Sequence, residues 1–204
     1  MFTGIIQGLA VIESAQRLPG LTKLTCKFPQ HALTSLQRGA SIALNGVCLT
    51  VTDYNDQQVS FDVMSETLRT TNLAAVNEGD KVNFERAARI GDEIGGHLVS
   101  GHIHTKAKII SRNDTENNCT LLFQLEQKWA KYIIPKGFIT VNGASLTVGS
   151  DVTNDRFSVH LIPETLSVTT FGTAKAGDTV NIEIDTQTQT IVDTIERLGL
   201  KLNN

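Results

Sequence analysis

The chain has few cysteines, no run of basic residues and no long apolar stretch, and each shortage excludes a class of protein. Its three cysteines, Cys26, Cys48 and Cys119, show neither zinc-ribbon spacing nor a disulfide framework, so we expect reduced thiols and a cytoplasmic location. The net charge of −3 and the lack of a Lys/Arg cluster argue against nucleic acid or an anionic membrane as partner. The first residues lack the basic and apolar regions of a signal peptide, and no apolar run of about 18 residues is present. A small molecule is the expected partner, with no nucleic acid and no membrane.

What the sequence does contain is an internal duplication. Residues 45–51, NGVCLTV, return as residues 142–148, NGASLTV. An Asn-Gly pair tolerates positive φ at both central positions of a tight hairpin turn, and the alternating run behind it predicts a strand. At one position of this strand the two copies differ in chemistry, because Cys48 in the first is matched by Ser145 in the second.

Other segments repeat in the same order. The matched ranges are 3–12 with 100–109, 21–28 with 120–125, 59–68 with 157–166, and 79–85 with 177–183. Alternating runs separated by Gly, Asn and Asp predict β-strands over these ranges, beginning with a strand over 2–12. Five or six strands per half, with hardly a helical period among them, predict an all-β fold of two tandem antiparallel barrels or sandwiches, and closed barrels fit best because each half is small.

The repeat also sets the expected domain boundaries. We expect an N-terminal barrel over 1–97, a C-terminal barrel over 98–187, and a helix with a tail over 188–204. Residues 86–96, RAARIGDEIGG, are interpreted as the linker, because their glycines lack the spacing and the βαβ setting of a dinucleotide fingerprint.

An amphipathic helix is predicted over residues 188–202. Its apolar stripe consists of Ile191, Val192, Ile195, Leu198 and Leu202. Such a stripe either docks on its own barrel or, as we favour, mediates self-association.

Two residues are candidates for chemistry. Cys48 alone would be a small buried hydrophobe, but the hydroxyl of Ser145 at the matching position suggests that both copies keep a polar face. His102 stands where Ile5 stands in the first half, so the halves differ where an acid or base would matter. A surface histidine without a chemical role is the alternative.

A metal site is disfavoured. His97, His102 and His104 are close in sequence, but no Asp, Glu or Cys pattern beside them completes a ligand set. Asp185, just before the predicted helix, either caps that helix or reaches a ligand.

Several motifs carry a resemblance that covers essentially the whole chain. MFTGIIQG at the start, the NGVCLTV run, GGHLVSGHIH and HLIPETL resemble the riboflavin synthase family in order and in spacing. The resemblance implies a homotrimer with two Greek-key, six-stranded barrels per subunit, each binding one 6,7-dimethyl-8-ribityllumazine. It also implies that the C-terminal helix contributes to the trimer and that no metal or organic cofactor is needed. An association with lumazine synthase would fit the same resemblance.

The reaction implied by the resemblance is a dismutation. One lumazine gives a four-carbon unit to another, yielding riboflavin and 5-amino-6-(D-ribitylamino)uracil. Two related pockets brought face to face would hold two copies of one ligand in a reactive geometry. The resemblance places this active site between the first barrel of one subunit and the second barrel of its neighbour.

The resemblance also implies the ligand contacts. Those assigned to the first barrel are Gly4, Ile5, Ile6, Cys48, Leu49, Thr50, Asp62, Val63, Met64, Ser65, Glu66 and Thr67. Those assigned to the second are Gly101, His102, Ile103, Lys136, Ser145, Leu146, Thr147, His160, Leu161, Ile162, Pro163, Glu164 and Thr165. The backbone around Met64 and Ile162 is expected to bond the pteridine edge as an added strand would.

Roles follow from the implied chemistry, in which one lumazine loses a proton from its C7 methyl group and another is attacked at C7. His102, Ser145 and Thr147 are assigned to proton transfer and anion stabilisation. Cys48 is the candidate nucleophile or proton shuttle, and Asp185 is expected to reach across the subunit boundary. Which barrel holds the donor, and which group is the first base, stays open.

Two rival functions are considered. A non-catalytic lumazine- or flavin-binding protein on the same barrels is disfavoured, because each position that the resemblance marks as chemical carries a reactive side chain. The second rival is a zinc hydrolase, and measuring the metal content of the purified protein would test it.

Overall fold

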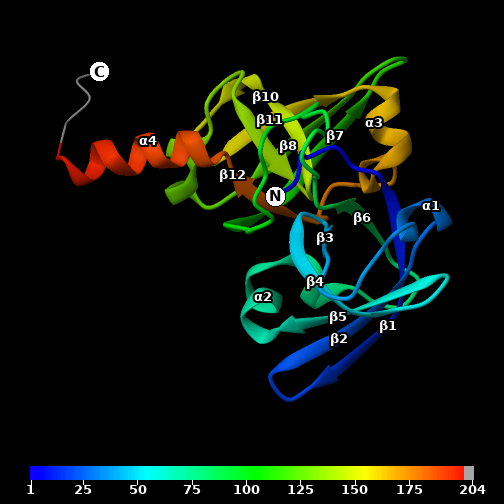
Figure 1. Cartoon of the computed structure of the whole chain (residues 1–204). Helices are drawn as coiled ribbons and strands as arrows, with labels where there is room; N and C mark the ends of the chain where they lie inside the picture. The colour runs from blue at the N-terminus through cyan, green and yellow to red at the C-terminus, as the bar shows by residue number, and fades with distance from the viewer. Residues whose placement is uncertain (200–204) are drawn as a thin grey trace.

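The computed structural model describes residues 1–199, which form two closed antiparallel barrels of six strands each (Figure 1). The prediction of an all-β fold built from two duplicated barrels is confirmed. The first barrel consists of β1 (Gly8–Leu18), β2 (Leu21–Lys27), β3 (Ser41–Leu44), β4 (Val47–Tyr54), β5 (Gln58–Met64) and β6 (Lys81–Arg86). The second consists of β7 (Thr105–Asp114), β8 (Cys119–Gln124), β9 (Phe138–Val141), β10 (Ala144–Val152), β11 (Arg156–Leu161) and β12 (Thr179–Ile184).

Both barrels have the same topology. Strand order around the first is β1-β2-β5-β4-β3-β6, and the second repeats it with β7 in the place of β1. β3, β4 and β5 follow one another as neighbours, and β6 returns to lie beside β3, which is a Greek key.

The two Asn-Gly pairs form the hairpin turns that the sequence predicts. Asn45 and Gly46 have φ values of 44° and 80° between β3 and β4, and Asn142 and Gly143 have 44° and 84° between β9 and β10. The first turn pairs Ala43 with Cys48, and the second pairs Thr140 with Ser145. The turns therefore place the two differing residues at equivalent sites.

Each barrel encloses its own apolar core. Phe61 and Phe84 are fully buried in the first, and Phe123 and Phe157 stack in the second with ring centroids 5.1 Å apart. Cys26 and Cys119 also lie in the two cores, whereas Cys48 is only half-buried. All three thiols are free, as predicted.

The N-terminal segment runs between the barrels (Figure 1), and the strand predicted over 2–12 is wrong in its limits. Phe2 forms an isolated antiparallel bridge with Val99, donating to its carbonyl at 2.8 Å, and the first long strand starts only at Gly8. Gly4 has a φ of 74°, which turns the chain out of the extended conformation after Thr3.

Short helices, which the sequence reading lacked, connect the strands. They are α1 (Gln30–Leu33), α2 (Ser65–Thr70), α3 (Pro163–Val168) and the 3₁₀ turns η1 (Asn72–Ala75), η2 (Gln127–Tyr132) and η3 (Thr170–Gly172). The ranges 59–68 and 157–166 were expected to be strands throughout, but they turn helical at Ser65 and Pro163. Pro163 has the fixed φ that suits the first turn of a helix and lacks the N–H that a strand would use.

The predicted C-terminal helix is α4 (Thr186–Arg197). Asp185 is its N-cap and accepts from the Thr188 N–H at 2.8 Å, so the capping alternative is the one observed. Leu202 of the predicted stripe lies outside the described residues. Among residues 1–199, no helix is long and apolar enough to cross a membrane.

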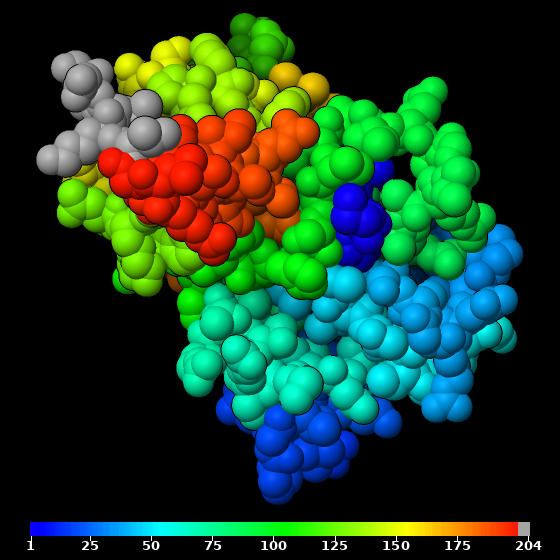
Figure 2. Space-filling view, turned by 60° about the vertical axis from the view of Figure 1, so that its left-hand side comes forward, coloured from blue at the N-terminus to red at the C-terminus, as the bar shows by residue number. Residues whose placement is uncertain are grey.

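Polar side chains of α4 bond η2 of the second barrel, and the helix projects from that barrel (Figure 1), so that it stands in front of the barrel in Figure 2. Tyr132 of η2 donates to Asp193, and Lys131 pairs with Glu196. Val192 packs against the core of the second barrel, but Ile191 and Leu198 stay 60% and 66% exposed, so the apolar stripe is only partly covered within one chain.

Candidate active site

In the first barrel, the candidate ligand contacts lie where two neighbouring strands separate. β4 pairs with β5 only from Val51↔Phe61 to Tyr54↔Val59. The residues before Val51 and those after Phe61 lie beyond the paired region, on the two arms of an opening. We call these arms, residues 48–50 and 62–64, the first fork.

The second barrel has the same opening. β10 and β11 pair at Val148↔Val159 and Val152↔Phe157, so residues 145–147 and 160–162 again extend past the paired region. We call these arms the second fork. Both forks are built from residues that the family resemblance implies, and both follow from the topology shared by the two barrels.

Main-chain groups point into the first fork. Val51 donates to Ala40 on the β3 side, so Thr50, which alternates with it, directs its N–H group to the other side. The Cys48 N–H on that side already donates to the Gly101 carbonyl. On the opposite arm, Ser65 donates to Gly20 on the β2 side, which leaves the groups of Met64 facing the fork. An edge of a planar polar ring could thus bond between the arms as a strand would.

Side chains on the fork alternate between the core and the outer face. Leu49, Val63 and Leu161 point into the cores, so only their main chains could reach a ligand. Met64 is 68% exposed and Ile162 57% exposed on the outer face. Exposed apolar side chains at both forks provide surfaces on which an aromatic ring could lie.

The remaining implied contacts frame the forks. Ser65, Glu66 and Thr67 open α2 directly after the first fork, and Pro163, Glu164 and Thr165 open α3 after the second. Lys136 is exposed and donates its N–H to the Val148 carbonyl at 3.0 Å, which places it at the base of the second fork. The exposed His160 pairs with the Thr120 hydroxyl at 3.0 Å.

The loops at 4–6 and 101–103 cross between the barrels, so the expected assignment of each loop to its own barrel is wrong. The Cys48 N–H donates to the Gly101 carbonyl at 2.9 Å, and the Ser145 N–H donates to the Gly4 carbonyl at 2.8 Å. Ile103 packs on the first core and Ile6 on the second. His102 therefore belongs beside the first fork, because its loop completes that fork.

The crossing is tight enough to require glycine. Gly101 has a φ of 86°, and a Cβ added there would lie 2.5 Å from the Cβ of Cys48. A Cβ on Gly4 would lie 2.5 Å from the Cβ of Ser145. Each loop thus lies in van der Waals contact with the side chain that differs between the two forks, Cys48 in the first and Ser145 in the second.

Ser145 belongs to a partly buried series of hydrogen-bonded polar groups that the first fork lacks. Its Oγ lies 2.6 Å from Nδ1 of His97, and Nε2 of His97 lies 3.1 Å from the Thr140 hydroxyl. Burial lowers the pKa of His97, and the charge of Asp185 partly opposes this. In the first barrel, Ala43 stands beside Cys48 where Thr140 stands beside Ser145.

The histidines do not form a metal centre. His97 is occupied by two hydroxyl groups, and His104 bonds Gln189 at 3.0 Å and the Ile184 N–H at 3.2 Å. Among the residues that the structure describes, no group of three or more His, Cys, Asp or Glu could hold a metal ion.

Sequence reasoning missed three residues of this region. The sequence pattern suggests His97 only as a metal ligand, and it indicates no role for Glu85 or Glu183. Both glutamates end a repeated strand and are 2% exposed, with carboxylates that bond the crossing loops. A charged residue repeated at the end of a buried strand was the signal that could have revealed them.

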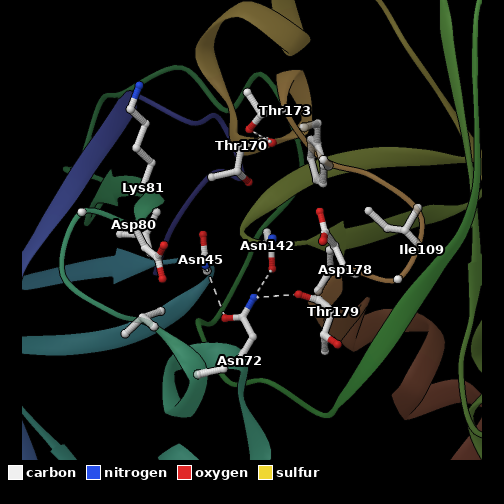
Figure 3. Close-up of a pocket in the computed structure, with 18 residues that line it drawn as sticks. Asn45, Asn72, Asp80, Lys81, Ile109, Asn142, Thr170, Thr173, Asp178 and Thr179 are labelled. Atoms are coloured by element: carbon white, nitrogen blue, oxygen red, sulfur yellow. Dashed lines mark hydrogen bonds between the residues drawn. The ribbon is translucent and has the colours of Figure 1, made fainter.

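One cavity lies away from the forks. It measures about 670 Å³ between the barrels and contains none of the fork residues. Within it, the Asn72 side chain lies between Asn45 and Asn142 and also reaches Thr179 (Figure 3). Its polar groups are mostly satisfied by one another, so we assign it to the joint between the barrels and place the chemistry at the forks.

Comparisons with known proteins match both barrels. The lumazine binding domain model fits residues 3–87 and again 100–185. Riboflavin synthase of Escherichia coli (strain K12) is 54% identical over 199 residues, 97% of this chain and 93% of that protein. Riboflavin synthase of Chlamydia pneumoniae is 42% identical over 198 residues, covering 97% and 96%. The solved structure of LumP complexed with riboflavin superposes with a TM-score of 0.84 at 27% identity, covering 91% of this chain and 100% of that one.

Proposed function

The chain belongs to the riboflavin synthase family, and we infer from this membership that it converts two 6,7-dimethyl-8-ribityllumazine molecules into riboflavin and 5-amino-6-(D-ribitylamino)uracil. One molecule gives four carbons to the other, so the enzyme is a transferase. A reaction between two identical molecules needs two pockets that have the same shape but carry different reactive groups. The two forks have that relationship, because their backbones match and their reactive side chains differ.

The observation that carries the proposal is the hydrogen-bonded series Ser145–His97–Thr140. Proton removal from the C7 methyl group needs a base, and Ser145 can serve if its own proton passes to Nδ1 of His97. The Nε2–H of His97 then donates to Thr140, which fixes the tautomer. Because burial lowers the pKa of His97, the imidazole is neutral near pH 7 and free to accept. Thr147, on the same outer face, supplies a hydroxyl to the developing anion.

The first fork has a different set of groups. Cys48 is half-buried beneath the loop that contains Gly101. His102, which follows Gly101, is exposed, and its N–H donates to the Ser100 hydroxyl at 3.1 Å. We assign Cys48 to attack or proton shuttling at the lumazine held there, with His102 as its proton partner. The backbone of Thr50 and Met64 binds the edge of the ring.

We further propose that the complete site forms between two copies of the chain in a homotrimer. Met64, Ile162 and Ile5 are exposed around the forks, which supports a partner surface that covers the bound ligands. The exposed Ile191 and Leu198 of α4 support contact between subunits. Asp185 is occupied as the helix cap, so we assign it to its own chain, where its charge acts on His97.

Location and further partners belong to the same proposal. Three free thiols support a reducing compartment, and the cytoplasm is the proposed location. Association with lumazine synthase stays a prediction of the family resemblance.

The test is direct. Purified protein treated with a chelator is mixed with 6,7-dimethyl-8-ribityllumazine, and growth of the riboflavin absorption band is followed. Ser145→Ala is expected to abolish most of the turnover while the protein still binds riboflavin. Binding without turnover by the parent protein would favour the non-catalytic alternative.

A further inference from the structure

Two buried glutamates repeat the same contacts in the two halves. The Glu85 carboxylate accepts from the Thr3 N–H at 2.6 Å, the Thr3 hydroxyl at 2.7 Å and the Gly4 N–H at 3.0 Å. The Glu183 carboxylate accepts from the Ser100 N–H and hydroxyl, both at 2.7 Å, and from the Gly101 N–H at 3.0 Å. Such a set of three donors fixes a loop more firmly than neutral partners would.

Each clamp extends to the next residue. The Thr3 hydroxyl accepts from the Ile5 N–H at 3.2 Å, and the Ser100 hydroxyl accepts from the His102 N–H at 3.1 Å. The carboxylate orients the hydroxyl, and the hydroxyl holds the residue that follows the glycine. Glu183 thereby determines where the main chain of His102 lies.

The clamped loops then reach the opposite barrel. Glu183 belongs to the second barrel, but the carbonyl of its loop at Gly101 accepts from the Cys48 N–H in the first. Glu85 belongs to the first barrel, but the carbonyl of its loop at Gly4 accepts from the Ser145 N–H in the second. Neither glutamate lies on a fork, so neither is placed to contact a ligand there.

We propose that Glu85 and Glu183 are crossed positioning residues, each holding the reactive side chain of the barrel to which it does not belong. Glu183 positions Cys48 and His102 at the first fork, and Glu85 positions Ser145 at the second. The consequence for catalysis rests on the proposed function, whereas the crossing itself concerns two main-chain amides and can be tested without turnover. A glutamine is nearly isosteric, but its NH₂ group faces the glycine N–H and cannot accept from it.

The experiment compares Glu183→Gln with Glu85→Gln in the full chain by amide hydrogen exchange of the ¹⁵N-labelled protein. Glu183→Gln is expected to speed exchange at the Cys48 amide severalfold and to leave the Ser145 amide at its parent rate. Glu85→Gln is expected to do the reverse. Alkylation of Cys48 by iodoacetamide gives a second readout, which should change in Glu183→Gln alone, with the buried Cys26 as internal reference.

Equal acceleration of both amides in each variant would show general loosening and overturn the proposal. Acceleration confined to the barrel that carries the substitution would overturn it too. Where a glutamine variant fails to fold, Ser100→Ala and Thr3→Val each remove one hydroxyl of the clamp and must show the same crossed pattern. A crossed pattern in a protein without turnover would uphold the positioning and refute the proposed catalytic role.

Discussion

Nδ1 of His97 lies 2.6 Å from Oγ of Ser145, in a place where burial lowers the pKa of the imidazole. The unfolded chain gains a proton on this residue near pH 6.5, its ordinary pKa of about 6.5, whereas the folded chain gains it only at lower pH. Above that pH, His97 therefore does not lower the free energy of unfolding. The free energy of unfolding is expected to fall as the pH drops through about 6.5 toward the folded pKa.

Urea unfolding of the parent and of His97→Gln at several pH values checks this. In His97→Gln, the free energy of unfolding is expected to depend less steeply on pH, because the contribution of His97 is lost. His31→Gln, at an exposed position, is expected to keep the pH dependence of the parent. Parent and His97→Gln curves that run parallel between about pH 5.5 and 7.5 would contradict the prediction.

Cys48→Ala is expected to lower turnover by about 100-fold or more, because it removes a reactive group at the first fork. Riboflavin binding should change little, since the backbone of the fork and the exposed Met64 remain. Steady-state rates and a fluorescence titration separate the two effects. Cys48→Ser, which makes the first fork resemble the second, is the matched control and should retain more activity. Turnover by Cys48→Ala near the parent rate would return Cys48 to a packing role.

Gly101→Ala is expected to destabilise the fold by more than Gly20→Ala. Both glycines have positive φ, of 86° and 83°, so both substitutions carry the left-handed backbone penalty of about 1–2 kcal/mol. Only at Gly101 does the new Cβ clash with Cys48, at 2.5 Å, whereas no atom lies within 4 Å at Gly20. Thermal unfolding measures the difference in stability. Equal losses of stability in the two variants would show that the loop at Gly101 can move to accommodate the added Cβ.

Asn72→Ala is expected to cost about 1–3 kcal/mol of stability. The Asn72 amide donates to Asn142 at 3.1 Å and accepts from Asn181 at 2.9 Å, and the substitution removes both hydrogen bonds, although Asn142 and Asn181 each keep another one. Thr170 is the matched control, because its N–H bonds Asn83 as that of Asn72 bonds Asn181. The Thr170 hydroxyl is buried with no hydrogen-bond partner among the described residues, so Thr170→Val should be neutral or stabilising. Chemical denaturation that ranks the two variants the other way would refute this account of the joint.

Replacing Ile191 and Leu198 by serine is expected to weaken the oligomer without unfolding the barrels. Both side chains are exposed on α4, whereas the contact of Asp193 with Tyr132 that holds the helix to its barrel is left intact. Sedimentation velocity over a dilution series reports the assembly state. A variant that sediments as the parent does at every concentration would show that the barrels alone hold the subunits.

The duplication, the all-β class and the equivalence of Cys48 with Ser145 can all be predicted from the amino-acid sequence. These are local properties, because an Asn-Gly pair sets the turn, and the turn sets the register of the strand behind it. The same local logic misjudged residues 2–7 and the ends of the fifth and eleventh strands. In residues 2–7 a positive φ at Gly4 turns the chain, and at the end of the eleventh strand Pro163 does so, although the alternation continues in the sequence.

Which loop completes which fork depends on the packing of the two barrels and cannot be predicted from the sequence. The repeat suggests that Gly4 belongs with Cys48 and Gly101 with Ser145, but the chain crosses between the barrels and pairs them the other way. Nothing local encodes this exchange, because it depends on how two equivalent barrels pack against each other through Glu85, Glu183 and the segment around Phe2. The partner of His97 was hidden for the same reason, since its contact with Ser145 joins the connecting segment to a strand far along the chain.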